Sequence, residues 1–147
     1  MTHNELKQKA LGLLARREHS YKELTWKLKR YVDDEAIIDA VVAELQQQNL
    51  QSDSRFAENF VHWRVSLGFG PQHISQDLAQ RGVAGHIIAE VTKKYHDEWL
   101  MHAERVRQKR FGKLWPADAK MLAKQKRYLY QRGFSAEQIS LIFKEFC

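Results

Sequence analysis

The densest chemical signal in the sequence is a basic segment that runs from Arg105 to Arg132. Asp118 is the one acidic residue within it. Lysine and arginine neutralise phosphates and carboxylates, and exposed helices usually mix both signs of charge. The segment therefore predicts a surface for an anionic partner. Its ten cations are Arg105, Arg107, Lys109, Arg110, Lys113, Lys120, Lys124, Lys126, Arg127 and Arg132.

Aromatic residues interleave with these cations, at Phe111, Trp115, Tyr128 and Tyr130. Aromatic faces can stack on unpaired bases, which would suit a nucleic-acid partner. The same rings can instead form the core behind a solvated helix face. We favour the core for the rings and partner binding for the charges, and we expect Arg105, Arg107, Lys109 and Arg110 to face solvent.

The charge is unevenly distributed along the chain. The formal net charge is +6 and the pI is near 9.5. By count, residues 1–50 are neutral, residues 51–104 carry −2 and residues 105–147 carry +8. A protein that wraps nucleic acid along its whole length should be basic throughout. The distribution therefore favours one basic end over a uniformly basic binding surface.

No motif for catalysis or cofactor binding stands out. The sequence lacks a G-x-x-x-x-G-K-[ST] loop, a C-x-x-C pair and an H-E-x-x-H pair. G-F-G-P at 68–71 could be offered as a phosphate cradle, but a helix stop followed by a proline start explains it better. His86, His96 and His102 could in principle meet, yet scattered histidines are usually surface or core residues. We expect no enzyme activity, no metal and no cofactor.

Cellular context is suggested by two features. Cys147 is the one cysteine and cannot form an internal disulfide, which fits a reducing cytoplasm. No apolar run approaches the roughly 20 residues that a membrane span needs. We therefore expect a cytoplasmic protein without a membrane partner.

Helical periodicity predicts the elements that position the basic segment. In the central stretch, Phe56, Phe60, Trp63 and Leu67 fall on one helix face. Ser52 or Asp53 can cap this helix, glycines 68 and 70 can end it, and Pro71 can start the next. We expect Trp63 to be buried. Further helices are predicted at 4–18, after the capping-box pair Ser20 and Glu23, after the acidic residues 33–35, after Pro116 and at 135–146.

The apolar pattern recurs along the chain. A shift of 50 residues takes Leu24 to Ile74 and Leu28 to Leu78, and a further 51 takes Leu78 to Leu129. Such a recurrence is typical of repeat proteins. We predict an all-α fold of three tandem three-helix repeats, 1–50, 51–96 and 97–147, in an elongated curved array.

Arg64, Arg81 and Arg132 have more than one interpretation. Arg81 and Arg132 each precede a glycine at a helix end, where a cation complements the helix dipole. Arg64 could pair with an acid from a neighbouring helix. Arg64 and Arg81 are candidate secondary contacts for a partner, whereas Arg132 belongs to the main basic set.

Three runs together resemble a known family. They are A-L-x-L-L-A-R-R-x-x-S-x-x-E-L-x-x-K-L at 10–28, D-S-R-F-A-E at 53–58 with G-x-G-P at 68–71 and L-x-x-R-G-V at 78–83, and R-G-F-S-x-E-x-I at 132–139. In this order and spacing they look like the signature of the RecX family, whose members regulate the bacterial RecA recombinase.

The resemblance implies a function. By analogy, the protein would bind the RecA–DNA filament and restrain its recombinase and coprotease activities, without catalysis of its own. ATP would belong to the partner. The partner-binding set is then Arg105, Arg107, Lys109, Arg110, Lys113, Lys124, Lys126, Arg127 and Arg132, and single-stranded DNA is a further candidate partner. The alternative is a nonspecific nucleic-acid-binding helical protein.

Overall fold

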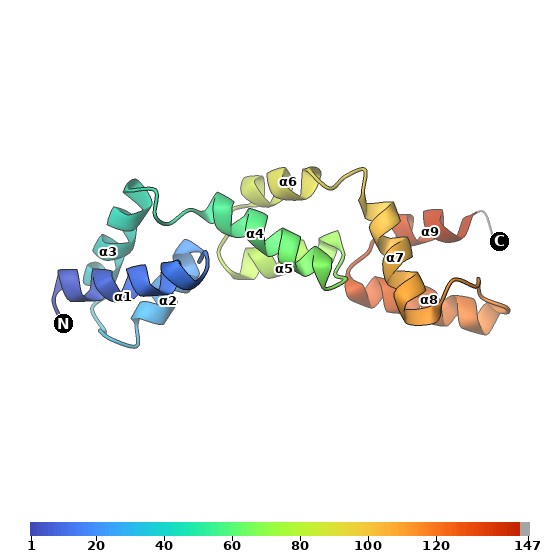
Figure 1. Ribbon diagram of the computed structural model, residues 1–147, viewed down its shortest axis with the longest axis horizontal. Helices are drawn as coiled ribbons and strands as arrows, with labels where there is room; N and C mark the ends of the chain where they lie inside the picture. Colours follow the sequence, from blue (N-terminus) through green and yellow to red (C-terminus); the bar gives the residue numbers. More distant parts are fainter. Residues whose placement is uncertain (145–147) are drawn as a thin grey trace. The chain divides into compact units, whose positions relative to one another are not determined.

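The computed structural model describes residues 1–144, and every regular element within that range is an α-helix. Figure 1 shows these helices in chain order. They are α1 (His3–Arg16), α2 (Tyr21–Leu28), α3 (Glu35–Gln47), α4 (Asp53–Ser66), α5 (Pro71–Gln80), α6 (Gly85–Lys93), α7 (Trp99–Phe111), α8 (Ala119–Arg132) and α9 (Ala136–Phe143). The predicted all-α class is confirmed. Residues 145–147, which include the predicted helix end at 146 and Cys147, lie outside the described residues.

Local capping chemistry sets the helix starts. Ser20 and Glu23 form the predicted capping box at α2, and Ser135 and Gln138 form another at α9. Asp34, from the acidic run, accepts a hydrogen bond from the Ala36 N–H at the start of α3. The sequence pattern therefore located these boundaries correctly.

At the start of α4 the two candidate capping residues have different partners. The Ser52 hydroxyl accepts from the Arg55 N–H, so Ser52 is the capping residue. The Asp53 carboxylate instead accepts from the Tyr21 N–H at 2.8 Å and from the Gln51 amide at 3.0 Å. Asp53 thus joins α4 to the start of α2.

The described chain divides into two compact units. Unit 1 comprises residues 1–60 and 78–88, and unit 2 comprises 61–77 and the described residues from 89 onward. In unit 1, α1, α2 and α3 enclose a core of aliphatic side chains. This core contains Leu6, Ala10, Leu24, Leu28, Ile38, Val41, Val42 and Leu45. In unit 2, α7, α8 and α9 bury Trp99, Ala103, Leu129, Phe134, Ile139 and Phe143.

The predicted apolar face of α4 is only half correct. Phe56 and Phe60 are buried, but Trp63 is 51% exposed and Leu67 is 46% exposed. Ala57 and Val61 are fully buried instead. The buried stripe is therefore rotated from the predicted one, and Trp63 lies on its flank with the Arg64 guanidinium 4.7 Å from its ring centroid.

Two arginine–glycine turns make equivalent contacts in the two units. In unit 1 the Ser20 hydroxyl donates to the Arg81 carbonyl at 2.7 Å. In unit 2 the Gly70 N–H donates to the Arg132 carbonyl, also at 2.7 Å. Ser20 and Gly70 are 50 residues apart, and Arg81 and Arg132 are 51 apart. The same register therefore docks each turn onto the start of an earlier helix.

Close backbone approach explains the glycine in each of these turns. Gly82 and Gly133 have φ angles of +83° and +105°, in the region that favours glycine. A Cβ on Gly82 would lie 2.7 Å from Lys22 Cβ, and a Cβ on Gly133 would lie 2.4 Å from His73 Cβ. A larger residue at either position would separate the helices that the turn joins.

Candidate interaction surface

The basic segment lies on α7, α8 and the connection between them, and we call the cations that it presents to solvent the basic face. Most of its predicted residues are exposed. These are Arg105, Lys109, Arg110, Lys113, Lys120, Lys124 and Arg127. Lys126 and Arg132 are half-buried. The structure thus brings most of the predicted cations to the surface of a single unit.

A groove of about 510 Å³ lies within this face. Arg105, Lys109 and Arg110 line it from α7, and Tyr128 and Arg132 line it from α8. The end of α4, at residues 65–68, forms the remaining wall. None of the described residues that line the groove carries a carboxylate. The groove therefore favours an anionic occupant by charge complementarity.

Arg107 departs from the prediction, because its side chain is fully buried. It forms an ion pair with Glu104 at 2.6 Å, and its guanidinium lies 4.0 Å from the Trp115 ring centroid. It also donates to the Leu114 carbonyl and the Gln125 side-chain oxygen, each at 3.3 Å. The prediction that Arg107 faces solvent is wrong, since this residue is the polar centre of the α7–α8 packing.

Arg132 lines the groove, and its guanidinium also contacts the residues that follow α4. Its guanidinium donates to the carbonyls of Leu67 and Gly68, and it lies 4.2 Å from the Phe69 ring centroid. These carbonyls end α4, where helix acceptors lack intrahelical donors. Arg132 therefore complements the negative end of α4, rather than only that of its own helix.

Arg64 has the acidic partner that the sequence suggested. Its Nη2 lies 2.9 Å from Asp77 Oδ2 on α5, and both side chains are mostly buried. The guanidinium also lies 5.0 Å from the Phe69 ring centroid. These contacts give Arg64 a structural role in unit 2, and a contact between Arg64 and a partner stays a prediction.

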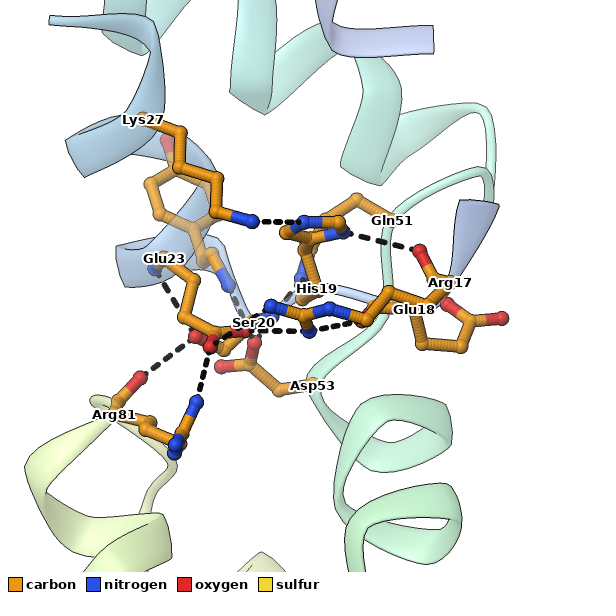
Figure 2. Close-up of polar contacts among 10 residues, drawn as sticks. Arg17, Glu18, His19, Ser20, Glu23, Lys27, Gln51, Asp53 and Arg81 are labelled. Carbon is orange, nitrogen blue, oxygen red and sulfur yellow. Dashed lines mark hydrogen bonds and ion pairs between the residues drawn. The ribbon is translucent and has the colours of Figure 1, made fainter. Parts of the chain in front are cut away.

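Arg81 belongs to a polar network in unit 1 (Figure 2). Its Nη1 lies 2.5 Å from Glu23 Oε2, and Glu23 also receives a hydrogen bond from Arg17 at 3.3 Å. Burial alone would raise the pKa of Glu23, but the hydrogen bonds from Arg17 and the Ser20 N–H lower it below its usual value. Glu23 is therefore an anion whose charge is neutralised inside the unit.

His19 is the buried centre of the same network. Its Nδ1 lies 3.0 Å from the Arg17 carbonyl, and its Nε2 lies 3.0 Å from Lys27 Nζ (Figure 2). A neutral ring satisfies both contacts, donating through Nδ1–H and accepting from the ammonium at Nε2. Burial lowers the pKa of His19, which agrees with this neutral form.

His102 is one of the residues that line the groove. Its Nε2 is 3.1 Å from the Phe69 carbonyl, which can accept the ring proton. Burial lowers the pKa of His102, and the charges of Arg105 and Arg132 lower it further. His102 is therefore neutral near pH 7 and adds a polar but uncharged wall to the groove.

The aromatic residues of the basic segment divide into packed and exposed rings. Phe111 and Tyr128 pack edge to face with centroids 5.4 Å apart, and Trp115 packs on Phe143. Tyr130 is 64% exposed. Phe111, Trp115 and Tyr128 are thus half-buried in ring contacts and lie at the edge of the core rather than inside it, while Tyr130 lies on the exposed surface of α8.

Trp26 is an exposed residue that the sequence interpretation missed. It lies on α2 within the first of the family-like runs, but off the Leu24–Leu28 stripe. A tryptophan on the polar side of an amphipathic helix was the signal that could have identified it.

The described part of the chain holds neither a metal-binding cluster nor a membrane-spanning helix. Across residues 1–144, no group of three or more His, Cys, Asp or Glu side chains is arranged to hold a metal ion. In the same range, no helix is both long enough and apolar enough to cross a membrane.

Comparison with known families matches most of the chain in three consecutive segments. The family models described as the first, second and third three-helix domains of RecX match residues 7–45, 52–91 and 96–143. Three tandem three-helix repeats are thereby confirmed. The finer boundaries 1–50, 51–96 and 97–147, and the elongated curved array, stay predictions.

Curated relatives carry the same name. Regulatory protein RecX of Halorhodospira halophila (strain DSM 244 / SL1) is 45% identical over 88% of this chain and 81% of its own length. Regulatory protein RecX of Stenotrophomonas maltophilia (strain R551-3) is 42% identical over 90% of this chain and 81% of its own length.

Solved structures share the fold. The crystal structure of RecX from Lactobacillus salivarius matches with a TM-score of 0.83 and 22% identity, covering 97% of this chain and 95% of that one. A second match, to a crystal structure of regulatory protein RecX, has the same TM-score and 20% identity, covering 97% of this chain and 71% of that one. From the three domain matches and the sequence identities, the chain belongs to the RecX family of regulatory proteins.

Proposed function

We propose that this protein binds the RecA–DNA filament and inhibits the recombinase and coprotease activities of RecA. Membership in the RecX family is the observation that carries the proposal. The protein acts by binding in the cytoplasm, and any nucleotide hydrolysis belongs to RecA. It needs no cofactor of its own.

The basic face is the proposed contact surface. Arg105, Lys109 and Arg110 are exposed on α7 around a groove without carboxylates. Lys113, Lys124 and Arg127 extend the positive charge around α8, and Lys126 and Arg132 contribute from half-buried positions. The DNA strand of a filament carries phosphates, and these would be attracted to such a face. Arg107 acts there only indirectly, because it holds α7 against α8.

Charge reversal tests the proposal. Replacing Arg105, Lys109 and Arg110 by glutamate should leave the circular dichroism spectrum unchanged, because all three side chains are exposed. It should weaken co-sedimentation with RecA on single-stranded DNA and relieve inhibition of strand exchange. The matched control reverses Arg16, Arg30 and Lys93, three exposed cations outside the basic face. Equal inhibition by both triple variants and the wild type would refute the proposal.

A nonspecific nucleic-acid-binding protein is the second candidate, because the groove is positive and free of described carboxylates. The two candidates differ in what RecA contributes. A regulator binds the RecA filament more tightly than naked DNA at physiological salt. A nonspecific binder binds both equally and does not alter strand exchange.

A further inference from the structure

Trp26 is an unusually exposed aromatic on the outer face of α2. Its side chain is 72% exposed, whereas Leu24 and Leu28 on the inner face are fully buried. Lys22 and Lys29 lie four residues before and three residues after Trp26, so helical spacing places all three on one side. The indole contributes little to the core and is flanked by cations on the surface of unit 1.

A groove of about 400 Å³ adjoins the Trp26 indole. Lys22, Lys27 and Lys29 bring positive charge to it. Lys29 Nζ also lies 3.6 Å from a carboxylate oxygen of Glu35, and both side chains are solvent-exposed, so a phosphate can replace this weak ion pair. The one lining carboxylate, on Glu23, is neutralised by its ion pairs with arginines inside unit 1 (Figure 2). An incoming ligand therefore meets positive charge rather than an available carboxylate.

The groove also has unused hydrogen-bonding capacity. Lys22 Nζ donates to the Gln80 carbonyl at 3.2 Å, which holds the ammonium at the groove edge. An ammonium has three donors, so this contact leaves donors for a ligand.

The repeat register places a similar pair of groups, in exchanged positions, on a second helix. Shifts of 50 and then 51 residues take Trp26 to Arg127 and Lys29 to Tyr130, on α8. Arg127 is exposed and Tyr130 is 64% exposed, so α8 also presents an aromatic and a cation three residues apart. The corresponding residues of α5, Gln76 and Ala79, are neither aromatic nor charged. Two helices of equivalent register therefore each carry an exposed aromatic and a cation three residues apart, in opposite order.

We propose that the outer face of α2 binds an unpaired nucleic-acid strand, with one base stacked on Trp26 and neighbouring phosphates bound by Lys22 and Lys29. Stacking on an aromatic ring suits every base, and the lysines suit the repeating phosphate. An acidic peptide would also be attracted by the lysines, but it carries no planar group along its chain that could stack on the indole. The inference rests on the proposed function, because it makes the filament's DNA strand the ligand of unit 1.

The test compares Trp26→Leu with Trp26→Phe in the full chain. Leucine keeps apolar surface without a ring, whereas phenylalanine keeps a stacking face. With a labelled oligothymidylate and no RecA, Trp26→Leu should weaken binding about tenfold, the order expected for one stacked base, and Trp26→Phe should retain most of the affinity. With an abasic oligonucleotide of equal length, wild type and both variants should bind equally, because only phosphates remain.

Three results would overturn the inference. The first is that the wild type shows no detectable binding to oligothymidylate, and the second is that Trp26→Leu binds it as tightly as the wild type. The third is that a polyglutamate peptide binds as tightly as the oligonucleotide and that its binding depends on Trp26 to the same degree. As a check on the phosphate contacts, Lys29→Gln should reduce the log–log salt slope by about 0.7. Because these binding assays contain no RecA, their outcome is independent of the strand-exchange test of the proposed function.

Discussion

Replacing Arg107 with alanine tests whether its buried side chain stabilises the packing of α7 against α8. Although Arg107 lies among exposed cations in the sequence, its side chain is fully buried. It has an ion pair to Glu104, two further oxygen acceptors and the face of Trp115 within reach. Truncation removes all of these contacts and leaves a void between α7 and α8.

The expected cost can be bounded from these contacts. Removing one member of a buried ion pair typically costs about 3–5 kcal/mol, mainly because the other charge is left without a partner. The Glu104 side chain keeps 26% exposure, so water can rehydrate its carboxylate after truncation. The cost should therefore lie near the lower limit, about 3 kcal/mol.

Urea denaturation of the full chain, followed by circular dichroism, measures this cost. Arg105→Ala is the matched control, since Arg105 lies on the same helix and carries the same charge but is exposed. The control should change the free energy of unfolding by less than about 0.5 kcal/mol. Replacing Arg107 by Met and Glu104 by Leu together should restore part of the loss, because an apolar pair needs no charge partner. If Arg107→Ala and Arg105→Ala have equal stability, the inferred role of Arg107 is wrong.

Two further predictions concern unit 1 and the arginine–glycine turns. Burial lowers the folded-state pKa of His19, so the stability that its neutral ring contributes is complete above the unfolded pKa near 6.5 and declines as pH falls through the folded pKa. His19→Gln should therefore reduce the loss of stability to urea between neutral and mildly acidic pH, and an unchanged dependence of stability on pH would contradict this. His102→Gln measures the share of the second buried histidine. Gly133→Ala should destabilise the protein by about 1–3 kcal/mol through its positive φ alone, whereas Gly12→Ala in the open interior of α1 should stabilise it by about 0.5–1 kcal/mol. Thermal melts in which both variants shift the stability in the same direction would refute the packing argument.

Local chemistry explains which parts of the fold were predictable. Capping boxes, proline at a first helical position and glycine after a helix depend on a few neighbouring residues, so the starts of α2, α5 and α9 could be located from sequence. The repeat register was equally accessible, because it compares the chain with itself. The family-like runs follow that register.

Tertiary context explains what was missed. Trp63 fits the apolar spacing of α4, yet Ala57 and Val61 are the residues that unit packing buries. A small residue such as alanine contributes little to a hydrophobicity pattern, although it allows helices to approach closely. Arg107 was misplaced for the complementary reason. Helix position alone cannot show that Glu104, Gln125 and Trp115 meet around a guanidinium.

The arginine–glycine turns combine contacts that the repeat register predicts with contacts that depend on tertiary packing. Arg81 ion-pairs with Glu23 at the start of α2, and Arg132 donates to the carbonyls that end α4. The side-chain partners differ, but each turn's carbonyl accepts a hydrogen bond from an equivalent position, Ser20 or Gly70. Each compact unit contains one such junction, which explains why the helices of the middle repeat are divided between the units. The turns therefore account for Arg81 and Arg132 structurally, while the outer faces of the second helices, α2 and α8, remain available to differ in charge and aromatic content.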